Sequence, residues 1–126
     1  MRLLVTGGRN YHDRKRVYRE LDAINPTSVI HGKAPGLDTL VDDWAKERGI
    51  PVHGFAARWT DLVTPPVLIR YRRDGVAYNA LAGGIRNQKM IDEGVPDYAL
   101  VFPGGSGTAD CLGRVVIARI PHKVLK

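Results

Sequence analysis

The sequence predicts one α/β domain in which helices cover both faces of a mostly parallel β-sheet. Two observations lead to this fold class. Short apolar runs typical of buried strands alternate with segments whose apolar residues recur every three to four positions, and glycine-rich loops follow several of these runs. The chain has 126 residues, 44% of them hydrophobic, which is enough for one core. Neither an internal repeat nor a linker divides it, so we expect a single domain over residues 1–126.

The first half of the chain alternates between strand and helix patterns. Strands are expected over residues 2–6, 27–31 and 50–55, and helices over residues 13–25 and 37–49. Asp13 is a suitable N-cap for the first helix, Asn25-Pro26 ends that helix, and Gly49 ends the second one.

After Trp59 the pattern changes to that of a β-hairpin. Residues 67–73 and 76–80 flank Asp74-Gly75, a dipeptide that tolerates the positive φ angles of a two-residue turn. Such a turn pairs Tyr71 with Tyr78. The alternation then resumes with a helix, a strand, a helix and a short final strand over residues 85–93, 98–102, 108–119 and 121–125.

Strands and helices in this order form right-handed βαβ units and predict a Rossmann-like, doubly wound sheet with strand order 3-2-1-4-5. The hairpin near residues 67–80 is an insertion between the third strand and the third helix, and it is not counted in that order. The carboxyl ends of the first and fourth strands are then neighbours, at the switch point where open α/β sheets bind ligands.

Three glycine-rich loops follow predicted strands and should meet at this switch point. Glycines let a ligand approach backbone N–H groups, and the last loop also opens a helix, whose N-terminus attracts phosphate. The loops contain neither the dinucleotide fingerprint nor a Gly-Lys-Ser/Thr phosphate loop, and glycines that only form turns are the alternative interpretation. The predicted ligand-binding residues are Gly7, Gly8, Arg9, Gly32, Lys33, Gly36, Asn87, Pro103, Gly104, Gly105, Ser106, Gly107 and Thr108.

Charged residues near these loops suit a nucleotide. We expect Arg9, Lys33 and Arg86 to neutralise the phosphate, and Asp38 to hydrogen-bond a ribose hydroxyl. The formal net charge of +6 also favours anionic partners, either nucleotides, nucleic acid or an acidic protein surface. The run Arg70-Tyr71-Arg72-Arg73 puts cations beside an aromatic ring, as in proteins that bind single-stranded nucleic acid, although a solvated hairpin strand is the favoured interpretation.

Other classes of site and location receive no support from the sequence. The four histidines and the single Cys111 lack metal-ligand spacing, so we expect no metal and no cofactor. No apolar stretch approaches the roughly 18–20 residues of a membrane span, and the apolar run after Met1 is too short for a signal peptide. We therefore expect a cytoplasmic protein that contacts no membrane.

Several motifs together carry a family resemblance. They are Thr6-Gly7-Gly8-Arg9, residues 31–38, Trp44-Ala45, residues 86–90 and residues 102–110. In these motifs the chain resembles, over nearly its whole length, the YspA-like branch of the SLOG superfamily. This Rossmann-like group also includes the DNA-processing protein DprA and the LOG phosphoribohydrolases. The resemblance implies a nucleotide-binding fold, and it implies function by analogy.

In the LOG enzymes the last loop reads Pro-Gly-Gly-x-Gly-Thr-x-x-Glu, and that glutamate acts in N-glycosidic cleavage with an arginine four residues before a methionine. Arg86 matches the arginine, whereas Cys111 stands at the glutamate position. The resemblance therefore implies nucleotide binding, alone or with cleavage of a base–ribose bond by Arg86 with Asp38 or Asp110. A DprA-like nucleic-acid-binding module is the alternative, and relatives of both kinds imply a homodimer.

Overall fold

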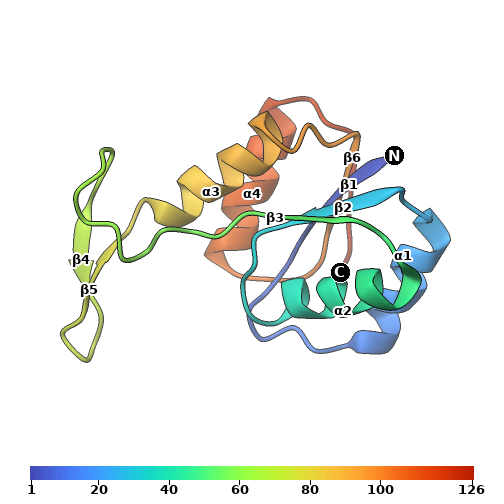
Figure 1. Cartoon of the computed structure of the whole chain (residues 1–126), viewed down its shortest axis with the longest axis horizontal. Coiled ribbons are helices and arrows are strands. Elements are labelled where there is room, and N and C mark those ends of the chain that lie inside the picture. The colour runs from blue at the N-terminus through green and yellow to red at the C-terminus, as the bar shows by residue number, and fades with distance from the viewer.

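The computed structural model describes all 126 residues, and its centre is a five-stranded parallel sheet with strand order β3-β2-β1-β6-β7 (Figure 1). All four strand pairings are parallel. The expected Rossmann-like order 3-2-1-4-5 is confirmed, with β6 and β7 as the fourth and fifth strands. The strands are β1 (Arg2–Thr6), β2 (Ser28–His31), β3 (Val52–Gly54), β6 (Tyr98–Val101) and β7 (His122–Val124).

Two helices cover each face of this sheet (Figure 1). Helices α1 (Arg14–Ile24) and α2 (Leu37–Arg48) lie on one face, and α3 (Ala82–Asp92) and α4 (Ser106–Ile117) lie on the other. None of the helices combines the length and apolarity that crossing a membrane requires.

Alternation along β1 divides the apolar residues between two cores. Leu3 and Val5 pack with α1 and α2, whereas Leu4 packs with α3 and α4, because successive side chains of a strand point to opposite faces. All three side chains are fully buried. Burial on both faces explains why the strand has no polar alternation in the sequence.

Helices α3 and α4 begin earlier than the sequence predicts. Helix α3 starts at Ala82 rather than at residue 85, and α4 starts at Ser106 rather than at Thr108. Gly83 lies in the first turn of α3, and Gly107 lies in the first turn of α4. Because glycine disfavours the helix, the sequence pattern placed both helix starts too late, although the helices form there. The difference matters because it brings the first turn of α4 into the glycine loop.

The antiparallel hairpin of β4 (Ile69–Tyr71) and β5 (Ala77–Asn79) is separate from the main sheet and projects from the body of the molecule (Figure 1). We call residues 67–80 the arm. The predicted pairing of Tyr71 with Tyr78 is wrong, because Tyr71 pairs with Ala77. Gly75, at φ +84°, donates its amide to the Arg72 carbonyl at 2.9 Å, so the turn has three residues rather than two. This shift by one residue moves Arg70, not Tyr71, opposite Tyr78.

Candidate functional site

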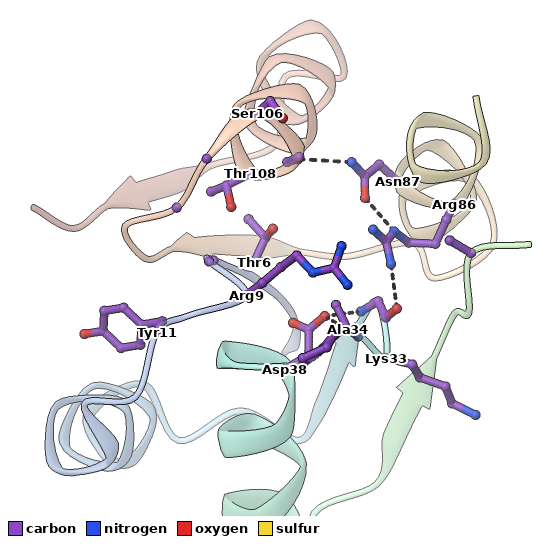
Figure 2. Close-up of a pocket in the computed structure, with 18 of the residues that line it drawn as sticks. Thr6, Arg9, Tyr11, Lys33, Ala34, Asp38, Arg86, Asn87, Ser106 and Thr108 are labelled. Atoms are coloured by element: carbon purple, nitrogen blue, oxygen red, sulfur yellow. Dashed lines mark hydrogen bonds between the residues drawn. The ribbon is translucent and has the colours of Figure 1, made fainter. Parts of the chain in front are cut away.

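A pocket of about 840 Å³ lies at the carboxyl edge of the sheet, where the loops after β1, β2 and β6 meet (Figure 2). The first turn of α4 and part of α3 complete its wall. Of the residues predicted from the sequence, those that line it are Gly7, Gly8, Arg9, Gly32, Lys33, Asp38, Arg86, Asn87, Pro103, Gly104, Gly105, Ser106, Gly107 and Thr108. Gly36 and Asp110 are not among the lining residues.

The loops after β1 and β6 touch through glycine. The Gly8 amide donates to the Pro103 carbonyl at 2.9 Å. A Cβ atom on Gly104 would lie 2.7 Å from the Gly8 nitrogen and would also overlap the Thr108 hydroxyl. Glycine at these positions therefore allows the two backbones to approach each other, a packing role that accompanies any role in ligand binding.

Gly36 joins the loop after β2 to the loop after β1 from outside the pocket. Its φ of +80° is a conformation that favours glycine, and a Cβ there would overlap the Arg9 backbone. The next amide, that of Leu37, donates to the Gly8 carbonyl at 3.1 Å. Gly36 thus positions Arg9 rather than lining the pocket.

Asp38 holds the loop after β2 with one of its carboxylate oxygens. Its Oδ2 accepts the amides of Gly32 at 3.2 Å and Ala34 at 3.1 Å. Burial raises the pKa of this carboxyl, and the two amides oppose that rise. Oδ1 has no hydrogen-bond partner within the protein, so one oxygen organises the loop while the other stays available to a ligand.

The first turn of α4 presents unsatisfied backbone donors to the pocket. Gly105 is the N-cap, and the amides of residues 105–108 have no acceptor within the protein. A Cβ on Gly105 or Gly107 would meet nothing within 4 Å, so the approach to these amides is open. Free amides at a helix N-terminus, together with the helix dipole, attract an anion.

Arg86 is half-buried and is held in one orientation (Figure 2). Its Nη1 donates to the Gly32 carbonyl at 2.6 Å, and its Nε donates to Asn87 Oδ1 at 2.8 Å. Burial lowers the pKa of this guanidinium, the Arg9 charge lowers it further, and Asp38 opposes both effects. Neither Arg86 nor Arg9 forms a salt bridge with a carboxylate. Asp38 is the only acidic residue that lines the pocket.

Lys33 contributes less to the positive charge of the pocket than the sequence predicts. It is exposed, and Figure 2 shows its side chain directed away from the other labelled pocket residues. Its stem lies against Gly54 of β3, where a Cβ would be 2.9 Å from Lys33 Cγ. The side chains of Arg9 and Arg86 are therefore the principal cations of the pocket.

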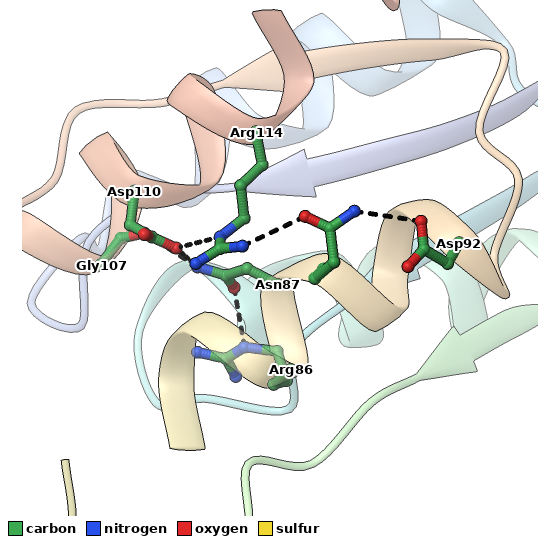
Figure 3. Close-up of polar contacts among 7 residues, drawn as sticks. Arg86, Asn87, Asp92, Gly107, Asp110 and Arg114 are labelled. Carbon is green, nitrogen blue, oxygen red and sulfur yellow. Dashed lines mark hydrogen bonds and ion pairs between the residues drawn. The ribbon is translucent and has the colours of Figure 1, made fainter. Parts of the chain in front are cut away.

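A chain of polar contacts continues from Arg86 to α4 (Figure 3). Asn87 Nδ2 donates to the Gly107 carbonyl at 3.2 Å and to Asp110 Oδ2 at 2.9 Å, and Arg114 Nε donates to the same carboxylate oxygen at 2.9 Å. Arg114 is the main reason that the pKa of Asp110 is lowered. Asp110 lines a second pocket, of about 750 Å³, and it acts on Arg86 through Asn87.

Sequence reasoning missed several lining residues, most of which lie in loops without a periodic pattern, whereas Met90 and Thr6 belong to a predicted helix and a predicted strand. The missed residues are Asn10, Tyr11, Ala34, Pro35, Ala56, Ala57, Trp59 and Met90, with Thr6 at the end of β1. The one available signal was Trp59, a large aromatic residue in an irregular segment that no apolar stripe accounts for.

Cys111, at the position where the LOG pattern has glutamate, faces the core of α3 and α4 rather than the pocket. It is fully buried, and burial raises the pKa of its thiol to about 11. No group of three or more His, Cys, Asp or Glu side chains is arranged to hold a metal ion.

The chain is similar to a known protein family and to a known protein. The family model described as the YspA, cpYpsA-related SLOG family matches residues 1–61. The Gene 61 protein of Mycobacterium phage D29 is 35% identical over 127 aligned positions, which cover 95% of this chain and 92% of that protein.

The environment of Cys111 predicts an inert thiol. With a pKa of about 11, roughly one thiol in a thousand is ionised at pH 8, and the thiolate is the reactive form. A disulfide reagent at pH 8 should therefore label the folded protein far more slowly than the protein unfolded in guanidinium, followed by absorbance. Equal labelling rates in the two states would contradict the buried position.

Proposed function

The chain belongs to the YspA, cpYpsA-related SLOG family, and we propose that it binds a nucleotide or a nucleotide-derived ligand in the pocket at the carboxyl edge of its sheet. One observation carries this proposal. Backbone amides without acceptors at residues 105–108 share a pocket with two guanidinium groups, Arg9 and Arg86, that have no carboxylate partner. A phosphate group complements both sets of donors.

The size and the remaining lining of the pocket favour a nucleotide over a bare phosphate. Its volume of about 840 Å³ falls in the range of pockets that hold whole organic ligands. Asp38 Oδ1 is available to accept a hydrogen bond from a sugar hydroxyl. A ligand with a phosphate, a sugar and a base uses each of these features.

A second form of the proposal adds cleavage of the base–ribose bond, and the state of Asp38 favours it. A buried carboxylate with a raised pKa and a free oxygen suits the stabilisation of an oxocarbenium-like sugar or the activation of water. Arg86 would orient the phosphate. Asp110 is less suited to this step, because Asn87 and Arg114 share one of its oxygens and it lines the second pocket.

A nucleic-acid-binding role is the second candidate function, and the arm supports it. Arg70, Arg72 and Arg73 are exposed and have no carboxylate partners. The Arg72 guanidinium lies 5.4 Å from the centre of the Tyr78 ring. Cations beside aromatic rings suit the backbone and bases of a single strand. The homodimer expected from the resemblance stays a prediction.

The phosphate proposal predicts that Arg86→Ala weakens the binding of a nucleoside monophosphate at least tenfold. Hydrogen bonds to charged groups contribute about 1.5–3 kcal/mol, and about 1.4 kcal/mol corresponds to a factor of ten. Asn87→Ala should weaken binding less, because Arg86 keeps its bond to the Gly32 carbonyl when Asn87 no longer orients it. Isothermal titration calorimetry measures both changes. Lys89→Ala is the matched control, since it removes an exposed cation from the same helix outside the pocket, and an equal loss there would refute the assignment.

The cleavage form predicts that Asp38→Asn abolishes release of free base while binding persists. Asparagine keeps a carbonyl oxygen for the Gly32 and Ala34 amides, so the loop should hold its shape. Chromatography of a nucleoside monophosphate incubated with each protein provides the measurement, with Asp43→Asn, which removes a carboxylate outside both pockets, as the control that retains activity. Undiminished release by Asp38→Asn would remove Asp38 from the mechanism, and no release by the unmodified protein would limit the function to binding.

The nucleic-acid proposal predicts strong salt dependence that resides in the arm. Each phosphate neutralised on a single strand contributes about −0.7 to the slope of log K against log salt, so replacing Arg70, Arg72 and Arg73 by alanine should make the slope shallower by about 2. Fluorescence anisotropy with a labelled oligonucleotide gives the slope. A control variant removes the same charge from α1, at Lys15, Arg16 and Arg19. An unchanged slope in the arm variant would exclude this role.

A further inference from the structure

Trp59 lies where the two pockets meet. It lines both of them, together with Asn87, Ser106 and Gly107. The indole therefore borders the same space as the first turn of α4, whose free amides form the phosphate site of the proposed function. A ligand bound to those amides can reach this ring within the same pocket.

The indole is fixed before any ligand arrives. A Cβ on Gly83 would be 3.0 Å from the indole Cη2 atom, so the ring lies directly against the first turn of α3. The Tyr78 ring meets it edge-on, with ring centroids 6.3 Å apart and an interplanar angle of 60°. The backbone carbonyl of Trp59 accepts a hydrogen bond from the backbone amide of Asn79 at 2.7 Å. A ring held in this way loses little conformational freedom when something stacks on it.

No other aromatic side chain of the main pocket offers an equivalent face. Tyr11 is the only other aromatic residue that lines it. The Tyr11 ring packs against Phe102 with centroids 5.3 Å apart, and its hydroxyl is enclosed without a hydrogen-bond partner. Both rings are half-buried, but Tyr11 packs against the core, whereas Trp59 packs on Gly83 and Tyr78 outside both cores.

We propose that Trp59 stacks on the base of the bound nucleotide and so restricts the site to phosphate ligands that carry an aromatic base. This inference rests on the proposed function, because the phosphate at α4 brings the base within reach of the ring. Stacking on an aromatic side chain tolerates any of the bases, since each has a π-face. The Trp59 contact therefore recognises a nucleotide as a class, and selection among bases belongs to other residues.

The chain contains two tryptophans, and this allows a direct test. Trp44 is buried in the core, with its Nε1 bound to Asp22 at 2.9 Å, and it reports whether the protein is folded. Trp59 should report the ligand. AMP, GMP, CMP and UMP are titrated in turn, each compared with ribose 5-phosphate, which has the sugar and the phosphate but no base. Intrinsic fluorescence and calorimetry are recorded together.

The expected result is that at least one nucleotide binds and quenches Trp59 emission, while ribose 5-phosphate binds more weakly without quenching. Trp59→Leu should weaken nucleotide binding about tenfold or more and leave the affinity for ribose 5-phosphate unchanged. Trp59→Phe, which retains a ring, should recover part of the loss. Tyr71→Leu removes an exposed arm ring that lines neither pocket, and it should change nothing.

Each contrary result has a distinct meaning. Nucleotide binding that persists at full affinity in Trp59→Leu, or that leaves Trp59 emission unchanged, overturns the stacking role while the phosphate site stands. Equal affinity for ribose 5-phosphate and the nucleotides overturns it as well. If none of the five compounds binds to the unmodified protein, the proposed function fails and the role of Trp59 fails with it. Unchanged Trp44 emission in Trp59→Leu separates these outcomes from misfolding.

Discussion

The backbone contact between the loops that follow β1 and β6 determines where helix α4 begins. Gly8 and Gly104 lack side chains, so the two loops approach closely enough for a hydrogen bond between Gly8 and Pro103. The chain then turns at Gly105 directly into the helix. The free amides of the first turn consequently lie over the ends of the central strands, and every other part of the pocket is arranged around them.

The charge of the pocket is the counterpart of this backbone arrangement. Arg86 is held by a carbonyl and an amide oxygen, both of them neutral acceptors, and the nearby charge of Arg9 repels it. Burial of this cation costs free energy, and the nearby Asp38 charge offsets that cost only in part, because no carboxylate is bonded to the guanidinium. Charged groups perturbed by burial in this way are typical of functional sites.

Much of the fold and the loop cluster could be predicted, because apolar periodicity and glycine-rich strand ends are local features of the sequence. The strand order and the meeting of the loops followed from those features and from the handedness of βαβ units. The sequence could not reveal the register of the arm, since one hydrogen bond from Gly75 decides between two and three turn residues. The sequence also could not reveal that Asp110 lines the second pocket or that Trp59 lines the main pocket, because both positions depend on how distant segments pack.

The contact between the Tyr78 and Trp59 rings joins the arm to a residue that lines the main pocket. Tyr78 belongs to β5 of the arm, and the Asn79 amide of the same strand is bound to the Trp59 backbone. If the arm binds a macromolecule and moves on binding, the support that it gives to the indole would change as well. Thermodynamic linkage would then require ligand binding in the main pocket to change the affinity of the arm by the same factor. The Tyr78–Trp59 contact would in that case couple the two proposed binding sites.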